Sequence, residues 1–321
     1  SGKGAAVNVG RGMLMGGADV IPGVSGGTVA LILGIYERLV TAISHVDVEL
    51  ITHVRKGRIR EAAAHIDLTF LVTLLLGIAI GILSLGSLVN QLLSSTDTRE
   101  LTLAAFFGII LASSFLVARM IHVQHMQHGF MLTLLGIAGA AFAFWLTGLR
   151  GEEVELTYGY VFICGMIGIC AMILPGISGA YILLIMGAYL PLTDILKALP
   201  RGQVGMPELI IVLVFGAGCA VGLIAFSKVL RWLLAHHEAP TMAVLCGFMI
   251  GALRKIWPFQ RDLTPEVEKV KHKLFENTWP DAIDSHVVAC IAIAIAGAVA
   301  ILILDWLTGG HKREPLHDQP A

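Results

Sequence analysis

The stretch Pro22-Gly23-Val24-Ser25-Gly26 interrupts a long apolar segment, and the same pattern returns as Pro175-Gly176-Ile177-Ser178-Gly179. The offset between the copies is constant (175 − 22 = 153), and a Gly-x-Tyr triplet follows each at the same spacing, at 34–36 and 187–189. This indicates an internal duplication. Because proline ends a helix and glycine exposes the backbone, each copy breaks a membrane helix. Irregular backbone at membrane depth requires surrounding protein or a water-filled cavity, so these loops mark the centre of the fold.

The composition is that of a polytopic membrane protein. Of 321 residues, 56% are hydrophobic and 14% charged, against roughly 25% charged in soluble domains, and the mean hydropathy is +0.81. A net charge of −1 with scattered basic residues argues against a nucleic-acid partner. The cysteines lie in apolar stretches without metal-ligand spacing, so we expect small buried hydrophobes; they are Cys164, Cys170, Cys219, Cys246 and Cys290.

Apolar stretches near the ~20 residues that cross a bilayer predict an all-α protein of two repeats, each a re-entrant or broken helical hairpin plus about three transmembrane helices. The first repeat, 1–150, has its hairpin around 7–45, in two pieces at 7–20 and 26–45. The second, 151–310, has its broken hairpin at 156–199 and precedes a cytoplasmic tail, 311–321. The predicted spans are 68–93, 101–121, 129–149, 207–234, 240–257 and 286–308.

The repeats align beyond the loops, since Gly77 and Gly81 match Gly218 and Gly222, and Gly108 matches Gly247. Paired glycines four residues apart allow helix backbones to approach closely, which suits internal packing and a homodimer equally.

The number of crossings per repeat decides the relation between the halves. With three crossings per repeat, the second half is inverted relative to the first. The basic 38–67 loop then lies on the cytoplasmic side, and the acidic 152–155 segment lies on the outer side. The 254–285 loop also falls outside, and its many basic residues are balanced by acidic ones. The segment 156–174 is long enough to cross the membrane by itself. If it does, the number of crossings per repeat is even and the repeats are parallel instead. We expect inverted repeats.

Each Pro-Gly-x-Ser-Gly loop presents the features of an anion site. Proline and the first glycine break the hairpin, at Pro22, Gly23, Pro175 and Gly176. A helix that restarts after the serine offers free N–H groups and the positive end of its dipole. The predicted substrate-binding groups are Ser25, Gly26, Gly27 and Thr28 in the first copy and Ser178, Gly179 and Tyr181 in the second. The alternative is that both loops are tight hairpin tips needed for packing alone.

Charged residues near the apolar segments supply further candidates. Arg254 and Lys255 follow an apolar span, and arginine suits phosphate binding. Asp19 precedes the first loop, whereas its counterpart is Met172; an ionisable residue at membrane depth is a candidate for coupling, and a solvated charge at the interface is the alternative. Other candidates for coupling or charge balance are Glu37, Arg38 and Arg119. We predict no metal site for His122, His125 and His128, no catalytic residue and no cofactor.

The segment Ala18-Asp19-Val20-Ile21-Pro22-Gly23-Val24-Ser25-Gly26-Gly27-Thr28, followed by Gly34-Ile35-Tyr36-Glu37, resembles the signature of the DUF368 membrane family. The second copy and the stretch Gly251-Ala252-Leu253-Arg254-Lys255-Ile256-Trp257-Pro258 are similar to further family patterns. Ala180 departs from them, because a serine is expected there. The resemblance covers essentially the whole chain and implies a multi-pass protein of the bacterial cytoplasmic membrane that translocates polyprenyl phosphate, such as undecaprenyl phosphate, for carrier recycling in cell-envelope synthesis.

The residues and the resemblance together predict a flippase, not an enzyme, with the lipid phosphate held at the two loops and Arg254. A membrane lipid phosphatase or phosphotransferase is the first alternative, but it would need a nucleophile with a base, or a metal cluster. A carrier of a small soluble anion is the second. The coupling ion, the net direction of transport and the oligomeric state are not specified by the sequence.

Overall fold

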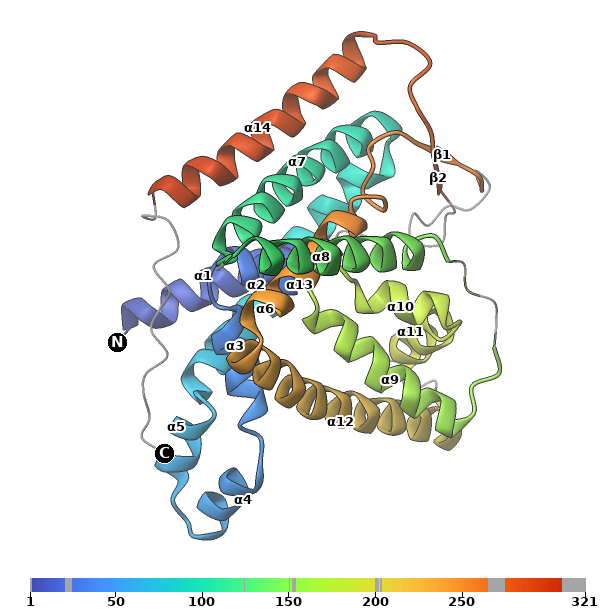
Figure 1. Ribbon diagram of the computed structural model, residues 1–321. Coiled ribbons are helices and arrows are strands. Elements are labelled where there is room, and N and C mark those ends of the chain that lie inside the picture. Colours follow the sequence, from blue (N-terminus) through green and yellow to red (C-terminus); the bar gives the residue numbers. More distant parts are fainter. Residues whose placement is uncertain are drawn as a thin grey trace.

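The computed structural model describes residues 2–20, 25–123, 125–149, 151, 154–199, 202, 204–264 and 275–307. The described chain is almost entirely helical (Figure 1). The helices of the first half are α1 (Gly2–Asp19), α2 (Gly26–Ile32), α3 (Tyr36–Ser44), α4 (Val48–Arg55), α5 (Ile59–His65), α6 (Leu68–Ser94), α7 (Thr96–Met120) and α8 (Met126–Leu146). Those of the second are α9 (Tyr158–Ile173), α10 (Gly179–Ile185), α11 (Tyr189–Ala198), α12 (Met206–His236), α13 (Glu238–Ala252) and α14 (Ser285–Leu307).

The prediction of an all-α polytopic membrane protein is confirmed. Within the described residues, five helices are long and apolar enough to cross a membrane, namely α6, α7, α8, α12 and α14, and two bent helix pairs raise the number to as many as seven. Strands β1 (Gln260–Asp262) and β2 (Phe275–Asn277) form a small antiparallel hairpin between α13 and α14. The predicted 38–67 loop also contains two short helices, α4 and α5.

The Gly-x-Tyr triplets mark a second break in each repeat, which corrects the prediction that 26–45 is a single helical piece. Helices α2 and α3 meet at 118°, and α10 and α11 meet at 113°. At the corners Gly34 has φ +68° and Gly187 has φ +69°, in the left-handed region that glycine favours. The Gly34 N–H donates to Leu31 O at 3.1 Å, and Gly187 N–H donates to Leu184 O at 3.0 Å. The duplication is therefore visible in three dimensions.

We expect replacement of Gly34 or Gly187 by alanine to destabilise the protein by about 1–2 kcal/mol each, because a Cβ disfavours the left-handed conformation. The measurement is the midpoint of thermal unfolding in detergent. Gly10→Ala is the matched control, since Gly10 lies within α1 and an added Cβ meets nothing within 4 Å. An unchanged midpoint for both corner variants would contradict the assigned turns.

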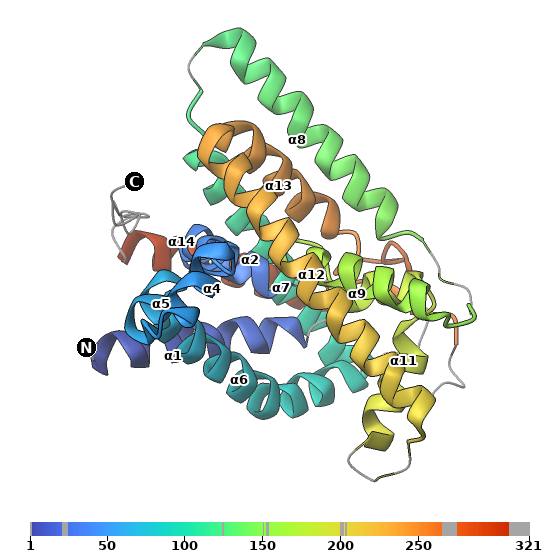
Figure 2. The same ribbon diagram turned by 90° about the horizontal axis from the view of Figure 1, so that it is seen from below.

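Glycines hold the first two long helices of each repeat in close contact, which is one of the two uses that the sequence left open. In the α1–α6 pair, a Cβ on Gly77 would clash with the carbonyl oxygen of Val9. In the α9–α12 pair, a Cβ on Gly218 would clash with the carbonyl oxygen of Phe162. Figure 2 shows α1 and α6 side by side. These glycine faces are therefore used for packing within the chain.

The remaining long helices interlock the two halves. Helix α7 packs along α14, and α8 packs along α13 (Figures 1 and 2). Gly108 on α7 lies against the backbone of Ala294 on α14. Its counterpart in the second repeat, Gly247 on α13, lies against the backbone of Gly136 on α8. Each half thus contributes one helix to each of the two pairs.

Candidate functional site

The two Pro-Gly-x-Ser-Gly copies lie against each other. Ser25 Oγ donates to the carbonyl oxygens of Met172 and Leu174, both at 3.3 Å. Thr28 Oγ1 accepts the N–H of Gly176 at 2.8 Å. Ser25 is 2% exposed and Thr28 1%, so these bonds are shielded from solvent. Pro22 and Gly23 lie outside the described residues, whereas Pro175 and Gly176 are buried.

The N-terminus of α2 is occupied by groups of the chain itself. The Asp19 carboxylate accepts the N–H of Gly26 at 2.5 Å, and Ser25 Oγ accepts the N–H of Gly27 at 3.2 Å. A Cβ on Gly26 would lie 2.7 Å from Asp19 Oδ2. The carboxylate of Asp19 therefore takes the position that an anion would occupy at this helix end.

The second copy lacks that carboxylate. Met172, the counterpart of Asp19, packs against Gly179 at the start of α10. Ser178 precedes α10 as its N-cap residue but makes no capping hydrogen bond with its side chain. Ser178 is partly exposed and Gly179 is buried. The duplicated backbone therefore carries a negative charge at the first copy and none at the second.

Two neighbouring cations lie near the second copy, with Lys255 against Tyr181 and Arg254 against the end of α8. Lys255 Nζ is 4.4 Å from the centre of the Tyr181 ring, and the Tyr181 hydroxyl donates to the carbonyl oxygens of Thr147 and Leu149, each at 2.9 Å. Arg254 donates through Nη1 to Phe144 O at 2.8 Å. No carboxylate of the described residues lies within ion-pair distance of Arg254 or Lys255, so both charges are available to an anion.

A third cation, Arg99 at the start of α7, joins this pair, although it was not among the candidates from sequence. Arg99 Nη2 donates to Gln260 Oε1 at 2.5 Å, and Gln260 Nε2 donates to the carbonyl oxygen of Lys255 at 3.0 Å. The guanidinium lies 3.3 Å from the centre of the Phe275 ring. Arg99 and Arg254 both lie close enough to repel the Lys255 ammonium electrostatically. The unusual basic content of the 254–285 loop was the available signal for this cluster.

The other predicted charges lie elsewhere. Arg38 pairs with Asp67 at 2.8 Å and stacks on Phe70, which ties α3 to the start of α6. Glu37 stands in the first turn of α3. Arg119 lies near Phe115 in the last turn of α7, and twenty residues of helix separate it from Arg99, a length of about 30 Å. Among the predicted coupling groups, Asp19 is the one in contact with the loops.

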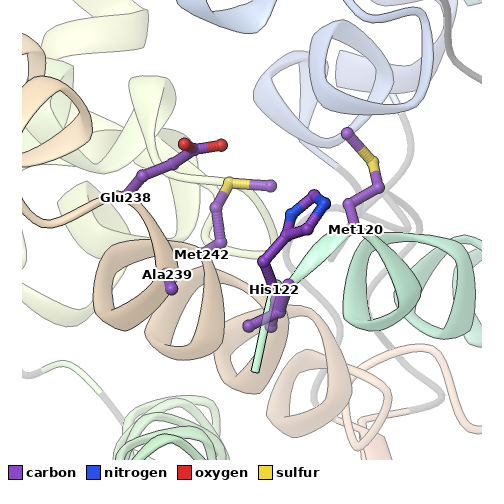
Figure 3. Close-up of a pocket in the computed structure, with 6 residues that line it drawn as sticks. Met120, His122, Glu238, Ala239 and Met242 are labelled. Atoms are coloured by element: carbon purple, nitrogen blue, oxygen red, sulfur yellow. The ribbon is translucent and has the colours of Figure 1, made fainter. Parts of the chain in front are cut away.

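A small hollow lies between the end of α7 and the start of α13 (Figure 3). Its lining includes Met120, His122, Glu238 and Met242. The second loop packs further along α13, where a Cβ on Gly176 would lie 2.7 Å from Phe248 O. The hollow is therefore separate from the loops and their cations.

Comparisons with known proteins place both loops and the cation pair inside a shared family region. Residues 15–273 match the VCA0040-like family, described as undecaprenyl phosphate translocase-like. A polyprenyl-phosphate transporter of Vibrio cholerae serotype O1 is 40% identical over 255 residues, covering 79% of this chain and 78% of that protein. A polyprenyl-phosphate transporter of Staphylococcus aureus is 31% identical over 267 residues, covering 78% of this chain and 86% of its own length. No solved structure gives a significant match. The chain therefore belongs to the undecaprenyl phosphate translocase-like family.

Proposed function

We propose that this protein carries a polyprenyl phosphate, such as undecaprenyl phosphate, across the bacterial cytoplasmic membrane. The proposal rests on one observation: two broken-helix loops touch within the helical bundle, and Lys255, which has no carboxylate partner among the described residues, lies against Tyr181 just after the second loop. A lipid monophosphate fits this arrangement because its anionic head needs positive charge and N–H donors while its chain stays in the bilayer. The two relatives, both named polyprenyl-phosphate transporters, support the substrate class.

In the proposed complex the phosphate lies at the second loop, between Ser178, Tyr181 and the cations Arg254 and Lys255. Arginine and lysine supply charge-assisted hydrogen bonds, which are roughly twice as strong as neutral ones. The N–H groups of Gly26 and Gly27, with Ser25, Thr28 and Gly179 nearby, complete the site when Asp19 withdraws. Asp19 thus competes with the phosphate for the α2 terminus, and Glu37, Arg38 and Arg119 serve charge balance outside the site.

Inverted repeats would let one site face both leaflets in turn. Helix direction supports this proposal. Helices α7 and α14 run parallel, because Glu100 meets His286 and Gly108 meets Ala294 further along both. Helices α8 and α13 also run parallel, because Gly136 meets Gly247 and Ala140 meets Gly251. Helix α8 runs in the opposite direction to α7, and α13 is parallel to α8. Helix α13 therefore runs opposite to α7, which is its counterpart in the first repeat.

The proposed function is tested in vesicles that contain the purified protein and undecaprenyl phosphate labelled in its lipid chain. A membrane-impermeant phosphatase in the outer solution removes phosphate from outer-leaflet lipid, and movement between leaflets makes the inner pool accessible. We expect the protein to expose that pool. Uptake of inorganic phosphate without lipid movement would favour a soluble-anion carrier, and phosphate release from the lipid by the protein itself would favour an enzyme.

We expect Asp19→Asn to strengthen lipid phosphate binding on the order of tenfold, because it removes a negative charge near the site while keeping an oxygen for the Gly26 N–H. The measurement is the dissociation constant in nanodiscs at fixed salt. Asp194→Asn is the matched control, since Asp194 is a surface residue paired with Lys197. Weaker or unchanged binding by Asp19→Asn would show that Asp19 does not compete with the phosphate.

A further inference from the structure

A cluster of three ligand-type side chains lies where α7 and α14 begin, outside the loop site. His286 Nε2 is 3.0 Å from Glu100 Oε2, and Cys290 Sγ is 3.8 Å from the same His286 nitrogen. One ligand atom from each residue lies within 4.8 Å of the other two. His286 and Cys290 stand one turn apart on α14, and Glu100 faces them from α7, which runs beside α14 in Figure 1.

These spacings match those around a tetrahedral metal ion. With Zn–N and Zn–O bonds near 2.1 Å and a Zn–S bond near 2.3 Å, tetrahedral angles place nitrogen about 3.4 Å from oxygen and about 3.6 Å from sulfur. The distances in the structure, 3.0 and 3.8 Å, differ from these by a few tenths of an ångström. The third pair, the Glu100 oxygen and the Cys290 sulfur, lies within 4.8 Å, so the ligand atoms need to move by about 1 Å at most to reach bonding distances of this size.

The cluster is both held in place and reachable. Cys290 is 1% exposed, whereas the side chains of His286 and Glu100 keep 32% and 20% of their surface. The close contact of Gly108 with Ala294 fixes the register of α7 against α14. The Asp284 carboxylate accepts the N–H of Val287 at 2.8 Å and so orders the first turn of α14. An ion can enter from the open side onto ligands carried by rigid helices.

We propose that Glu100, His286 and Cys290 bind a zinc-like divalent ion through one oxygen, one nitrogen and one sulfur. On binding, the Cys290 thiol releases its proton and bonds through the thiolate, His286 bonds through Nε2, and Glu100 bonds as the carboxylate. Three protein ligands leave a fourth position for water. The family match ends at residue 273, so two of the ligands lie beyond the region that defines the family.

The bound ion would hold the cation cluster of Arg99, Arg254 and Lys255 in place. Glu100 follows Arg99, which contacts Gln260 and Phe275 of the β1–β2 hairpin, and Gln260 in turn contacts the backbone of Lys255. Joining α14 to α7 through a metal would therefore hold the hairpin and Lys255 in a fixed position beside the second loop.

The test is Co²⁺ titration of the full-length protein in detergent, prepared metal-free under reducing conditions. We expect one Co²⁺ per chain with a thiolate-to-cobalt charge-transfer band, and Zn²⁺ should abolish the band by displacement and raise the midpoint of thermal unfolding. Cys290→Ser should lose the band, and His286→Gln should weaken Co²⁺ binding at least tenfold. The matched controls are Cys219→Ser and His128→Gln, which should bind as the unaltered chain does.

Three results would overturn the proposal. They are absence of the charge-transfer band in the unaltered protein, its persistence in Cys290→Ser, and equal Co²⁺ affinity in His286→Gln. A variant that fails to fold is replaced by Glu100→Gln, which keeps the hydrogen bond to His286 but should still weaken Co²⁺ binding. Because the readout is metal binding, the result is independent of whether the protein transports lipid.

Discussion

The double variant Arg254→Gln, Lys255→Gln is expected to weaken lipid phosphate binding by roughly a hundredfold and to reduce transport accordingly. A hydrogen bond to a charged group contributes about 1.5–3 kcal/mol, and about 1.4 kcal/mol corresponds to a factor of ten in affinity, so each cation accounts for about tenfold. Neither residue has a carboxylate partner among those described, so neutralising them strands no buried acid. The effect should therefore appear in binding, with little loss of stability.

The measurement combines nanodisc binding with the vesicle transport assay. Arg254→Lys separates charge from geometry, because lysine keeps the charge but loses the planar donor that bonds Phe144 O and stacks on the Phe144 ring at 4.4 Å. Lys197→Gln is the matched control, since Lys197 is an exposed helix residue paired with Asp194 and surface pairs of this kind contribute little. Full transport by the double variant, at normal expression, would show that the cation pair does not hold the phosphate.

Thr28→Val is expected to destabilise the protein by about 1–3 kcal/mol and to impair transport together with stability. The Thr28 hydroxyl accepts the N–H of Gly176 at 2.8 Å in a buried position. Valine has the same shape but no acceptor, so the substitution leaves the N–H buried without a partner. This one bond joins the first copy of the motif to the second, and its loss should loosen the contact between the loops.

The midpoint of thermal unfolding and the transport rate are measured on the same preparations. Thr28→Ser restores an acceptor and should recover most of both losses. Thr133→Val is the matched control, because the Thr133 hydroxyl donates to Gly129 O within α8 itself, so its removal leaves no backbone N–H without a partner. Equal stability of Thr28→Val and Thr133→Val would show that the bond between the loops does not hold them together.

Local signals in the sequence were sufficient to predict the long apolar helices and the breaks at the duplicated loops. Apolar length predicts spans, and proline and glycine predict breaks. Glycines four residues apart predict close helix contacts without naming the partner, which the structure shows to be α1 for α6 and α9 for α12. The corners at Gly34 and Gly187 were missed as breaks because the flanking residues are apolar on both sides. Their left-handed φ, and not a change in hydropathy, ends each helix.

Contacts between residues far apart in the chain could not be predicted from the sequence. Arg99 and Gln260 are 161 residues apart, and Glu100 and His286 are 186 apart, so no local pattern places Arg99 in the cation cluster or Glu100 beside Cys290. The sequence singled out Asp19 against Met172 as a difference between the copies. In the structure the Asp19 carboxylate accepts the Gly26 N–H. This contact depends on how α1 and α2 meet, which the sequence does not specify.

In the proposed complex, the touching loops and the cations near them hold the phosphate of a lipid. The most direct measurement is an experimental structure of the protein in a nanodisc with bound undecaprenyl phosphate. We expect phosphate density between Ser178, Tyr181 and Lys255, with the lipid chain leaving between helices towards the bilayer. Phosphate density at the hollow near His122 and Glu238, or anywhere apart from the two loops, would contradict it.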